Sequence, residues 1–141
     1  MKSYKVLLFV MVVLAVSHQA YAQEIAVIAN KSVGVTSIDA GKLASAYSLS
    51  MSEWSSGTAV KIGNYRAADE LKAKFYGAMK TSETELKKVW MKKKLGEGKE
   101  TPTLVNSEDE MVEFVKSSSG AIGFVSASKV TGDVVVIMKL K

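Results

Sequence analysis

Short apolar runs alternate with amphipathic stretches along most of this chain, and this alternation limits the fold more than any other feature. The runs at 25–29, 121–125 and 134–138 are rich in aliphatic side chains, as expected for strands buried on both faces. Weaker strand patterns lie at 59–63 and 103–105. Strands that alternate with helices predict an α/β fold with a mostly parallel sheet and helices on both faces.

Four stretches between these runs have the spacing and the start signals of helices. Asp39 is a good N-cap for a helix that runs to about Tyr47, and Thr81 or Ser82 is predicted to cap the third helix. Glu85 completes a capping box with Ser82, and Glu110 completes one with Ser107. The remaining helix is predicted over 67–80. Its inward stripe is predicted to consist of Ala68, Leu71, Phe75, Ala78 and Met79.

The first 22 residues have the three regions of a secretory signal peptide. Lys2 and Lys5 precede an apolar run over 6–16, which is shorter than the roughly 20 residues that a membrane span needs. The small-x-small triplet 20–22 predicts cleavage after Ala22. We therefore expect a signal peptide over 1–22 and a single domain over 23–141, with periplasmic or secreted localisation and no membrane span after cleavage.

The mature part lacks two residue types that most catalytic sites use. The chain has no Cys, and its one His, His18, lies in the leader. This excludes a thiolate nucleophile, a Ser-His-Asp triad and a Cys or His zinc set. Carboxylates such as Glu108 and Glu113 lie on a helix face that is predicted to be solvated. We expect a non-enzymatic protein with no catalytic residue, metal or cofactor.

The basic residues do not form a nucleic-acid footprint. Lys and Arg exceed Asp and Glu by 19 to 14, and the excess falls when Lys2 and Lys5 leave with the leader. The lysines at 87, 88 and 92–94 predict a solvated helix face, with an acidic partner or an anionic membrane surface as alternatives. Trp90 shares the stripe of that helix and is predicted to be core, and Trp54 is predicted to pin a Ser-rich loop.

The strongest candidate for an anion site is the junction between the second strand and its helix. Free backbone N–H groups at a helix N-terminus, together with the Arg66 guanidinium, suit a carboxylate or phosphate. Asp69 and Glu70 oppose a bound anion there. Ser119 and Gly120 offer a second group of contacts. The predicted ligand-binding residues are Asn64, Tyr65, Arg66, Ala67, Ser119 and Gly120.

Several segments, taken in order, resemble the phosphate-type periplasmic substrate-binding proteins of ABC transporters, which have the two-lobed type II solute-binding fold. The most specific is 119–125, Ser-Gly-Ala-Ile-Gly-Phe-Val, which is similar to the family's Pro-Gly-Ala-Ile-Gly-Tyr-Val. The other segments are 25–30, 38–44, the Trp-x-x-Gly loop at 54–57, Phe75-Tyr76, and Trp90 with the loop 98–102.

The resemblance implies one lobe of such a receptor, because 119 mature residues match about half of a two-lobed protein. It implies a small, phosphate-like anion as ligand, for transport or sensing. The family's gripping element, Arg-Ser-Asp-x-Ser-Gly-Thr, is reduced here to Arg66 followed by Ala67 and Ala68. The alternative is a periplasmic interaction or self-association module that kept the fold and lost the pocket. Candidate partners are ABC transporter membrane components, another envelope protein, or a second copy.

Overall fold

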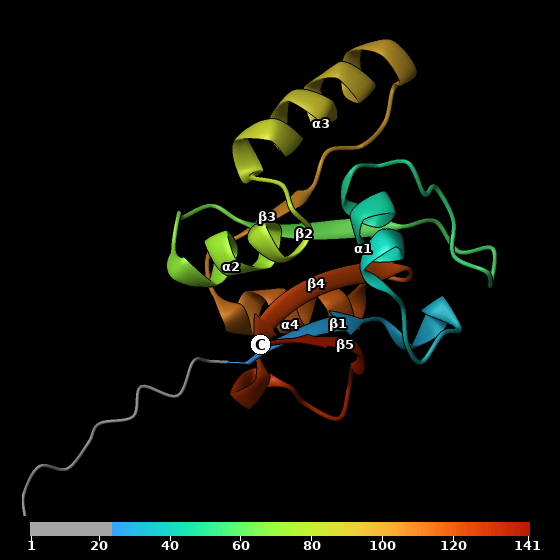
Figure 1. The fold of residues 1–141 in the computed structure, drawn as a ribbon. Helices are drawn as coiled ribbons and strands as arrows, with labels where there is room; N and C mark the ends of the chain where they lie inside the picture. Colours follow the sequence, from blue (N-terminus) through green and yellow to red (C-terminus); the bar gives the residue numbers. More distant parts are fainter. Residues whose placement is uncertain (1–23) are drawn as a thin grey trace, which may run out of the picture.

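The computed structural model describes residues 24–141, so the predicted signal peptide lies outside the described residues. The elements follow in the order predicted for an α/β chain (Figure 1). They are β1 (Ile25–Ala29), η2 (Lys31–Val33), α1 (Ala40–Tyr47), β2 (Lys61–Tyr65), α2 (Glu70–Ala78), α3 (Glu83–Glu97), β3 (Thr103–Val105), α4 (Glu108–Ser117), β4 (Ala121–Ser126), η3 (Ala127–Lys129) and β5 (Val135–Leu140).

The strands form one five-stranded mixed sheet in the order β3-β2-β4-β1-β5. β2 pairs in parallel with both β3 and β4, whereas β1 is antiparallel to β4 and β5. Four strands therefore run in one direction, and only β1 is reversed. The predicted α/β class is confirmed, and the carboxyl ends of β2, β3 and β4 meet at one edge of the sheet.

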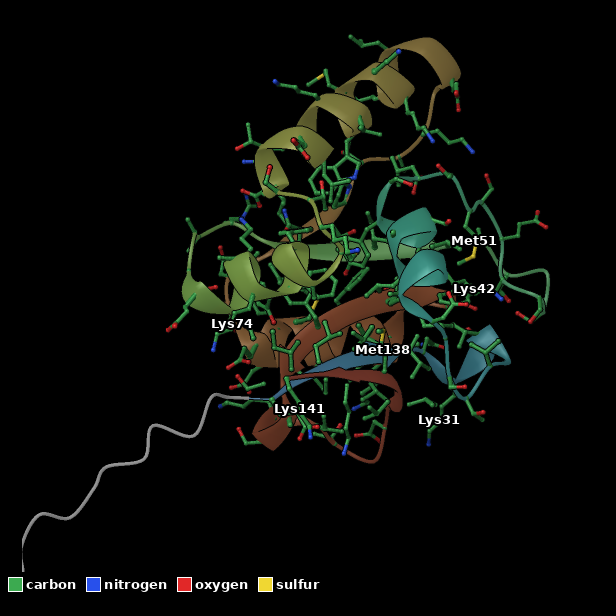
Figure 2. All side chains as sticks on the ribbon, in the orientation of Figure 1. Lys31, Lys42, Met51, Lys74, Met138 and Lys141 are labelled. Atoms are coloured by element: carbon green, nitrogen blue, oxygen red, sulfur yellow. The ribbon has the colours of Figure 1, made fainter. Side chains whose placement is uncertain are left out.

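Helices cover both faces of the sheet. On one face, α4 packs so closely that a Cβ at Gly63 or Gly123 would overlap the Met111 sulfur. Glycine at these two positions therefore lets α4 approach the sheet closely. On the other face, Phe124 of β4 stacks on Phe75 of α2 with ring centroids 3.7 Å apart. Side chains fill the space between these layers, whereas the labelled lysines 31 and 74 lie on the outside (Figure 2).

Helix starts agree well with the capping signals. The side chains of Asp39, Ser82 and Ser107 accept hydrogen bonds from backbone N–H groups of the first turns of α1, α3 and α4. Strand β2 is displaced from the predicted 59–63, because Asn64 and Tyr65 continue its ladder by pairing with β3.

The predicted inward stripe of the second helix is correct in part, because Phe75 is buried and Leu71 and Met79 pack against the core. Ala68 and Ala78 are exposed, and the buried side chains of α2 are Lys72, Phe75 and Tyr76. Lys72 and Tyr76 belong to the buried face in place of the two alanines, and Lys72 forms an ion pair with Glu83 of α3. α3 itself lies beyond the edge of the sheet that β3 forms (Figure 1).

Candidate functional site

The junction between β2 and α2 holds four of the predicted ligand residues, and only two of them face solvent. Arg66 and Ala67 are exposed, whereas Asn64 and Tyr65 are buried on β2. The Tyr65 hydroxyl donates a hydrogen bond to the Phe124 carbonyl. Burial, followed by the nearby carboxylates of Glu108 and Asp69, raises the pKa of Tyr65 well above its ordinary range. Only Arg66 therefore offers a charged donor here.

The N-terminus of α2 is closed by the protein's own carboxylates. α2 begins at Glu70 rather than near Ala67, because Asp69 is its N-cap and accepts a hydrogen bond from the Lys72 amide at 2.9 Å. Glu70 adds a second negative charge in the first turn. Acidic side chains at this position satisfy the positive end of the helix, so a bound anion would meet two carboxylates.

Ser119 and Gly120 lie at the opposite end of β2 from Arg66. Lys61, the first residue of β2, donates its amide to the Gly120 carbonyl, which also accepts the Trp54 indole N–H at 2.8 Å. Five residues of strand separate Lys61 from Arg66, or about 16 Å. The structure does not bring the two groups of predicted ligand residues together.

The Gly120 and Ser119 groups are also engaged locally. The Gly120 amide and the Ser119 hydroxyl both donate to the Ser32 hydroxyl, at 2.9 and 3.1 Å. A Cβ at Gly120 would overlap the Ala59 carbonyl oxygen, so the backbone approaches closely here and φ is +77°. Trp54 is buried and pins its loop to this turn, as the sequence predicts.

Behind the junction lies a buried polar group that we call the Lys72 cluster, which consists of Asn64, Lys72, Tyr76 and Glu83. Lys72 forms an ion pair with Glu83. The Asn64 amide donates to the same Glu83 carboxylate at 2.9 Å, and the Tyr76 hydroxyl donates to the Asn64 oxygen at 2.7 Å. The cluster therefore ties together β2, α2 and the first turn of α3.

In the Lys72 cluster, burial and hydrogen bonding shift the pKa of Glu83 in opposite directions. Burial raises the pKa of the Glu83 carboxyl, but hydrogen bonds from Lys72, Asn64 and Lys87 outweigh it, and the pKa lies below its ordinary value. Burial and the Glu83 carboxylate raise the pKa of Tyr76 well above its ordinary range. Glu83 is thus a carboxylate and Tyr76 a neutral phenol near neutral pH.

A cavity of about 260 Å³ adjoins the Lys72 cluster between α2 and the start of α3. Asp69, Lys72, Tyr76 and Glu83 line it together with small residues. Within residues 24–141, no buried side-chain nitrogen or oxygen lacks a hydrogen-bond partner. The polar atoms of the cluster already bind one another, so this arrangement acts as a clamp between elements.

A second cavity, of about 310 Å³, is lined in part by Asn64, and we call it the α3–β3 groove. Its apolar lining comes from Trp90 and Met91 of α3 and from Pro102 and Leu104. Trp90 is buried, as the sequence predicts, and donates its indole N–H to the Tyr47 carbonyl at 2.6 Å. Met91 and Leu104 remain exposed at 54% and 45%.

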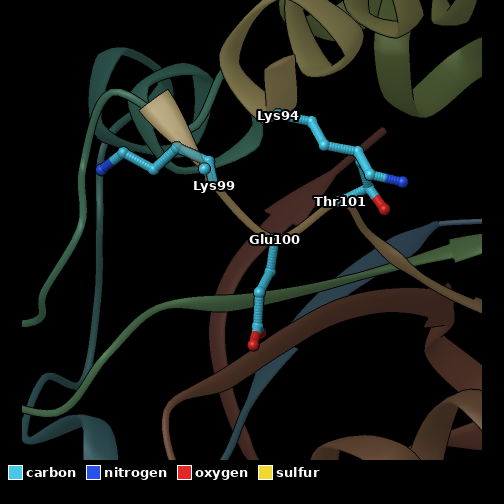
Figure 3. Close-up of a pocket in the computed structure, with 5 residues that line it drawn as sticks. Lys94, Lys99, Glu100 and Thr101 are labelled. Carbon is cyan, nitrogen blue, oxygen red and sulfur yellow. The ribbon is translucent and has the colours of Figure 1, made fainter. Parts of the chain in front are cut away.

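An open pocket of about 540 Å³ lies next to the groove at the C-terminal end of α3 (Figure 3). Its lining includes Lys94, Lys99, Glu100 and Thr101, and Thr101 also lines the groove. The Lys94 and Lys99 side chains point away from each other (Figure 3), and the Lys99 ammonium donates to the Ser52 hydroxyl at 2.5 Å. The two cations do not converge on a shared anion.

Sequence reasoning missed Lys72, Tyr76 and Glu83 as a functional or structural group. A signal was present: Lys72, Phe75, Tyr76 and Met79 share one face of a helix, so a lysine lies on an apolar stripe.

The described part of the chain contains no group of three metal-ligating side chains. None of its helices is long and apolar enough to cross a membrane.

Comparisons with known proteins give a match at the level of the fold. No family model and no curated protein sequence matches the chain. It is similar to an ABC-type phosphate transport receptor from Vibrio cholerae (TM-score 0.63, 18% identity) and to a putative phosphate ABC transporter substrate-binding protein with bound phosphate from Clostridium perfringens (TM-score 0.67, 15% identity). Each match covers 82% of this chain and 45% of the other.

The chain therefore has the fold of about half of a phosphate ABC transporter substrate-binding protein, which is one lobe. The predicted resemblance is confirmed for the fold. The proteins that it resembles are non-enzymatic binding proteins.

Proposed function

We propose that this chain is a non-enzymatic binding domain that acts outside the cytoplasm and recognises another protein. The closed N-terminus of α2 carries this proposal. Asp69 occupies the cap where a small anion would gain backbone N–H groups, and Glu70 adds like charge. A receptor lobe whose anion grip is filled by its own carboxylates keeps its fold and uses other surfaces.

The signal-peptide pattern over 1–22 supports a location outside the cytoplasm, either periplasmic or secreted. The fold of a transport-receptor lobe is consistent with this location. The partner classes in this compartment are an ABC transporter membrane component, another envelope protein or a second copy of the chain. The domain over 23–141 would act as a single unit in each case.

Binding of a small, phosphate-like anion near Arg66, for transport or sensing, is the second candidate function. It is favoured by the bound phosphate named for the Clostridium perfringens structure and by the exposure of Arg66, the only arginine in the sequence, directly after β2. Ala67 and the adjacent turn would supply backbone N–H groups. Ser119 and Gly120, at the far end of β2, would then belong to a different contact.

Calorimetric titration of the chain from residue 23 with phosphate, sulfate and a phosphonate separates the two candidates. We expect no saturable heat with any of them. The controls are Arg66→Ala and Lys61→Ala, which remove one exposed cation at each end of β2. Saturable anion binding that is lost in Arg66→Ala and kept in Lys61→Ala would contradict protein recognition. It would support anion binding as the function.

The protein partner is tested in cells of the source organism. A photoreactive residue on the exposed surface of the full-length chain should give a discrete cross-linked species in the envelope fraction. A chain that gives none at any of several positions, together with a monomeric mass by sedimentation, would contradict protein recognition.

A further inference from the structure

We propose that the α3–β3 groove docks an extended, acidic segment of the partner protein, whose apolar side chains enter the groove. This assignment rests on the proposed function, since it names the surface and the chemistry by which the chain recognises another protein. Four observations carry it: the apolar lining, the surrounding charge, the edge position of β3, and the concentration of exposed apolar side chains.

The groove is an unfilled apolar surface. Among residues 24–141, the three large hydrophobic side chains that remain exposed are Met91, Leu95 and Leu104. Met91 and Leu104 line the groove from opposite walls, and Leu95 follows Met91 by one helical turn. Their gathering at one place is the pattern of a recognition surface, whereas single exposed apolar residues are ordinary.

Lysines lie in the groove lining and in the pocket next to it. Lys87 lines the groove, and Lys94 lines the pocket that continues it past Thr101. Lys87 is 62% exposed and its ion pair with Glu83, at 3.2 Å, lies on the surface, where such a pair contributes little. Lys87, Lys94 and Lys99 line the groove and the adjoining pocket, whereas Glu100 is, among the described residues, the one acidic residue in the two linings. The excess positive charge favours carboxylates on the occupant.

The position of β3 favours an extended occupant. β3 is the edge strand of the sheet and pairs with β2 alone. A peptide that adds to an edge strand gains main-chain hydrogen bonds from the strand and specificity from pockets beside it. Here the groove between β3 and α3 supplies such a pocket, with Leu104 on the edge strand and Met91 on the helix.

The same charge disfavours a second copy as the occupant. A two-fold interface built on this surface would place the lysine-rich α3 of one copy against α3 of the other. The five lysines at 87, 88 and 92–94 would then repel their counterparts. A different protein with acidic side chains would not be repelled by these lysines.

The test is fluorescence anisotropy of a labelled ten-residue peptide of alternating glutamate and valine, titrated with the chain from residue 23. A matched peptide has glutamine in place of every glutamate. We expect saturable binding of the glutamate peptide that weakens about tenfold with Met91→Glu or Leu104→Glu, since both positions are exposed and the fold is retained. We also expect weakening in about 0.5 M NaCl.

A charge-matched pair of variants separates the groove from general attraction. Lys87→Ala with Lys94→Ala should weaken peptide binding, whereas Lys31→Ala with Lys74→Ala removes the same charge from exposed sites elsewhere and should not (Figure 2). Equal loss in both double variants, equal binding of the glutamine peptide, or absence of binding would overturn the assignment. Dimerisation that Leu104→Glu abolishes would identify a second copy as the occupant and overturn it as well.

Two further measurements distinguish this assignment from a membrane-binding surface and from a protein-binding surface elsewhere on the chain. Binding to phosphatidylglycerol vesicles that Met91→Glu abolishes, without peptide binding, would identify a membrane surface and reject a protein segment. A cross-linked envelope partner that persists in Met91→Glu and Leu104→Glu would leave protein recognition standing and reject the groove as its surface.

Discussion

The β2–α2 junction and the α3–β3 groove both adjoin Asn64, yet they are built in opposite ways. At the junction and in the Lys72 cluster behind it, polar groups bind other polar groups of the same chain. In the groove, apolar side chains stay exposed, with Lys87 in the lining and Lys94 in the pocket beside it. Two regions of one fold thus differ in what they leave exposed: satisfied polar groups at the junction and apolar side chains in the groove.

The largest effect on stability is expected from substitutions in the Lys72 cluster. Lys72→Ala should lower the free energy of unfolding by about 3 kcal/mol, because it leaves Glu83 partly buried without its main cation. Urea denaturation measures this. Lys72→Met combined with Glu83→Leu should recover a large part of the loss, since an apolar pair replaces an ion pair. A loss below 0.5 kcal/mol, roughly that of a surface substitution, would mean that the cluster is not a clamp.

A smaller loss is expected from Tyr76→Phe. The variant removes the hydroxyl that donates to Asn64 in a buried site, so the free energy of unfolding should fall by about 1 to 2 kcal/mol. The control is Tyr65→Phe, which removes a different buried hydroxyl on the same side of the sheet. Hydrogen exchange should report the Tyr76→Phe change at the start of α3, because Asn64 also holds Glu83. Unchanged exchange there would separate Tyr76 from the cluster.

The Lys72 cluster should also give a pH dependence of a definite sign. The folded-state pKa of Glu83 lies below its unfolded value, so its contribution to stability is complete above the unfolded pKa, about 4.3, and is lost as pH falls through the folded pKa. Glu83→Gln should therefore flatten part of the acid slope of unfolding free energy against pH. A variant with the same acid slope as the original chain would contradict this account.

The smallest effect on stability is expected in the groove. Met91→Ser and Leu104→Ser should change the free energy of unfolding by about 0.5 kcal/mol or less, because both side chains are exposed. Thermal denaturation checks this, with Trp90→Phe as the comparison from the buried wall of the same groove. Losses of several kcal/mol from the serine variants would mean that these residues serve the core and not recognition.

Local signals in the sequence were sufficient for much of the fold. The caps at Asp39, Ser82 and Ser107 placed three helix starts, and Trp54 has the predicted packing role. These features depend on neighbours within a few residues or on side-chain size. The reversed direction of β1 was not predicted, because a buried strand has the same apolar pattern in either direction.

The candidate site depended on contacts that no local pattern contains. Lys72 was not singled out, because helix position alone does not show that Glu83 will lie beside it. The separation of Arg66 from Ser119 and Gly120 follows from the parallel register of β2 with β4, in which Lys61 pairs with Ala121. The acidic character of the α2 start was visible in the sequence, and the structure makes Asp69 the cap itself.

The most direct test of the contrast between the two regions is a nitrogen-15 NMR titration of the chain from residue 23 with phosphate. The amide signals of Arg66 to Glu70 report the junction, and those of Met91 and Leu104 report the groove. The account predicts that phosphate leaves the junction signals unchanged, while the glutamate and valine peptide shifts the groove signals. Saturable phosphate shifts at Arg66 to Glu70 would contradict it.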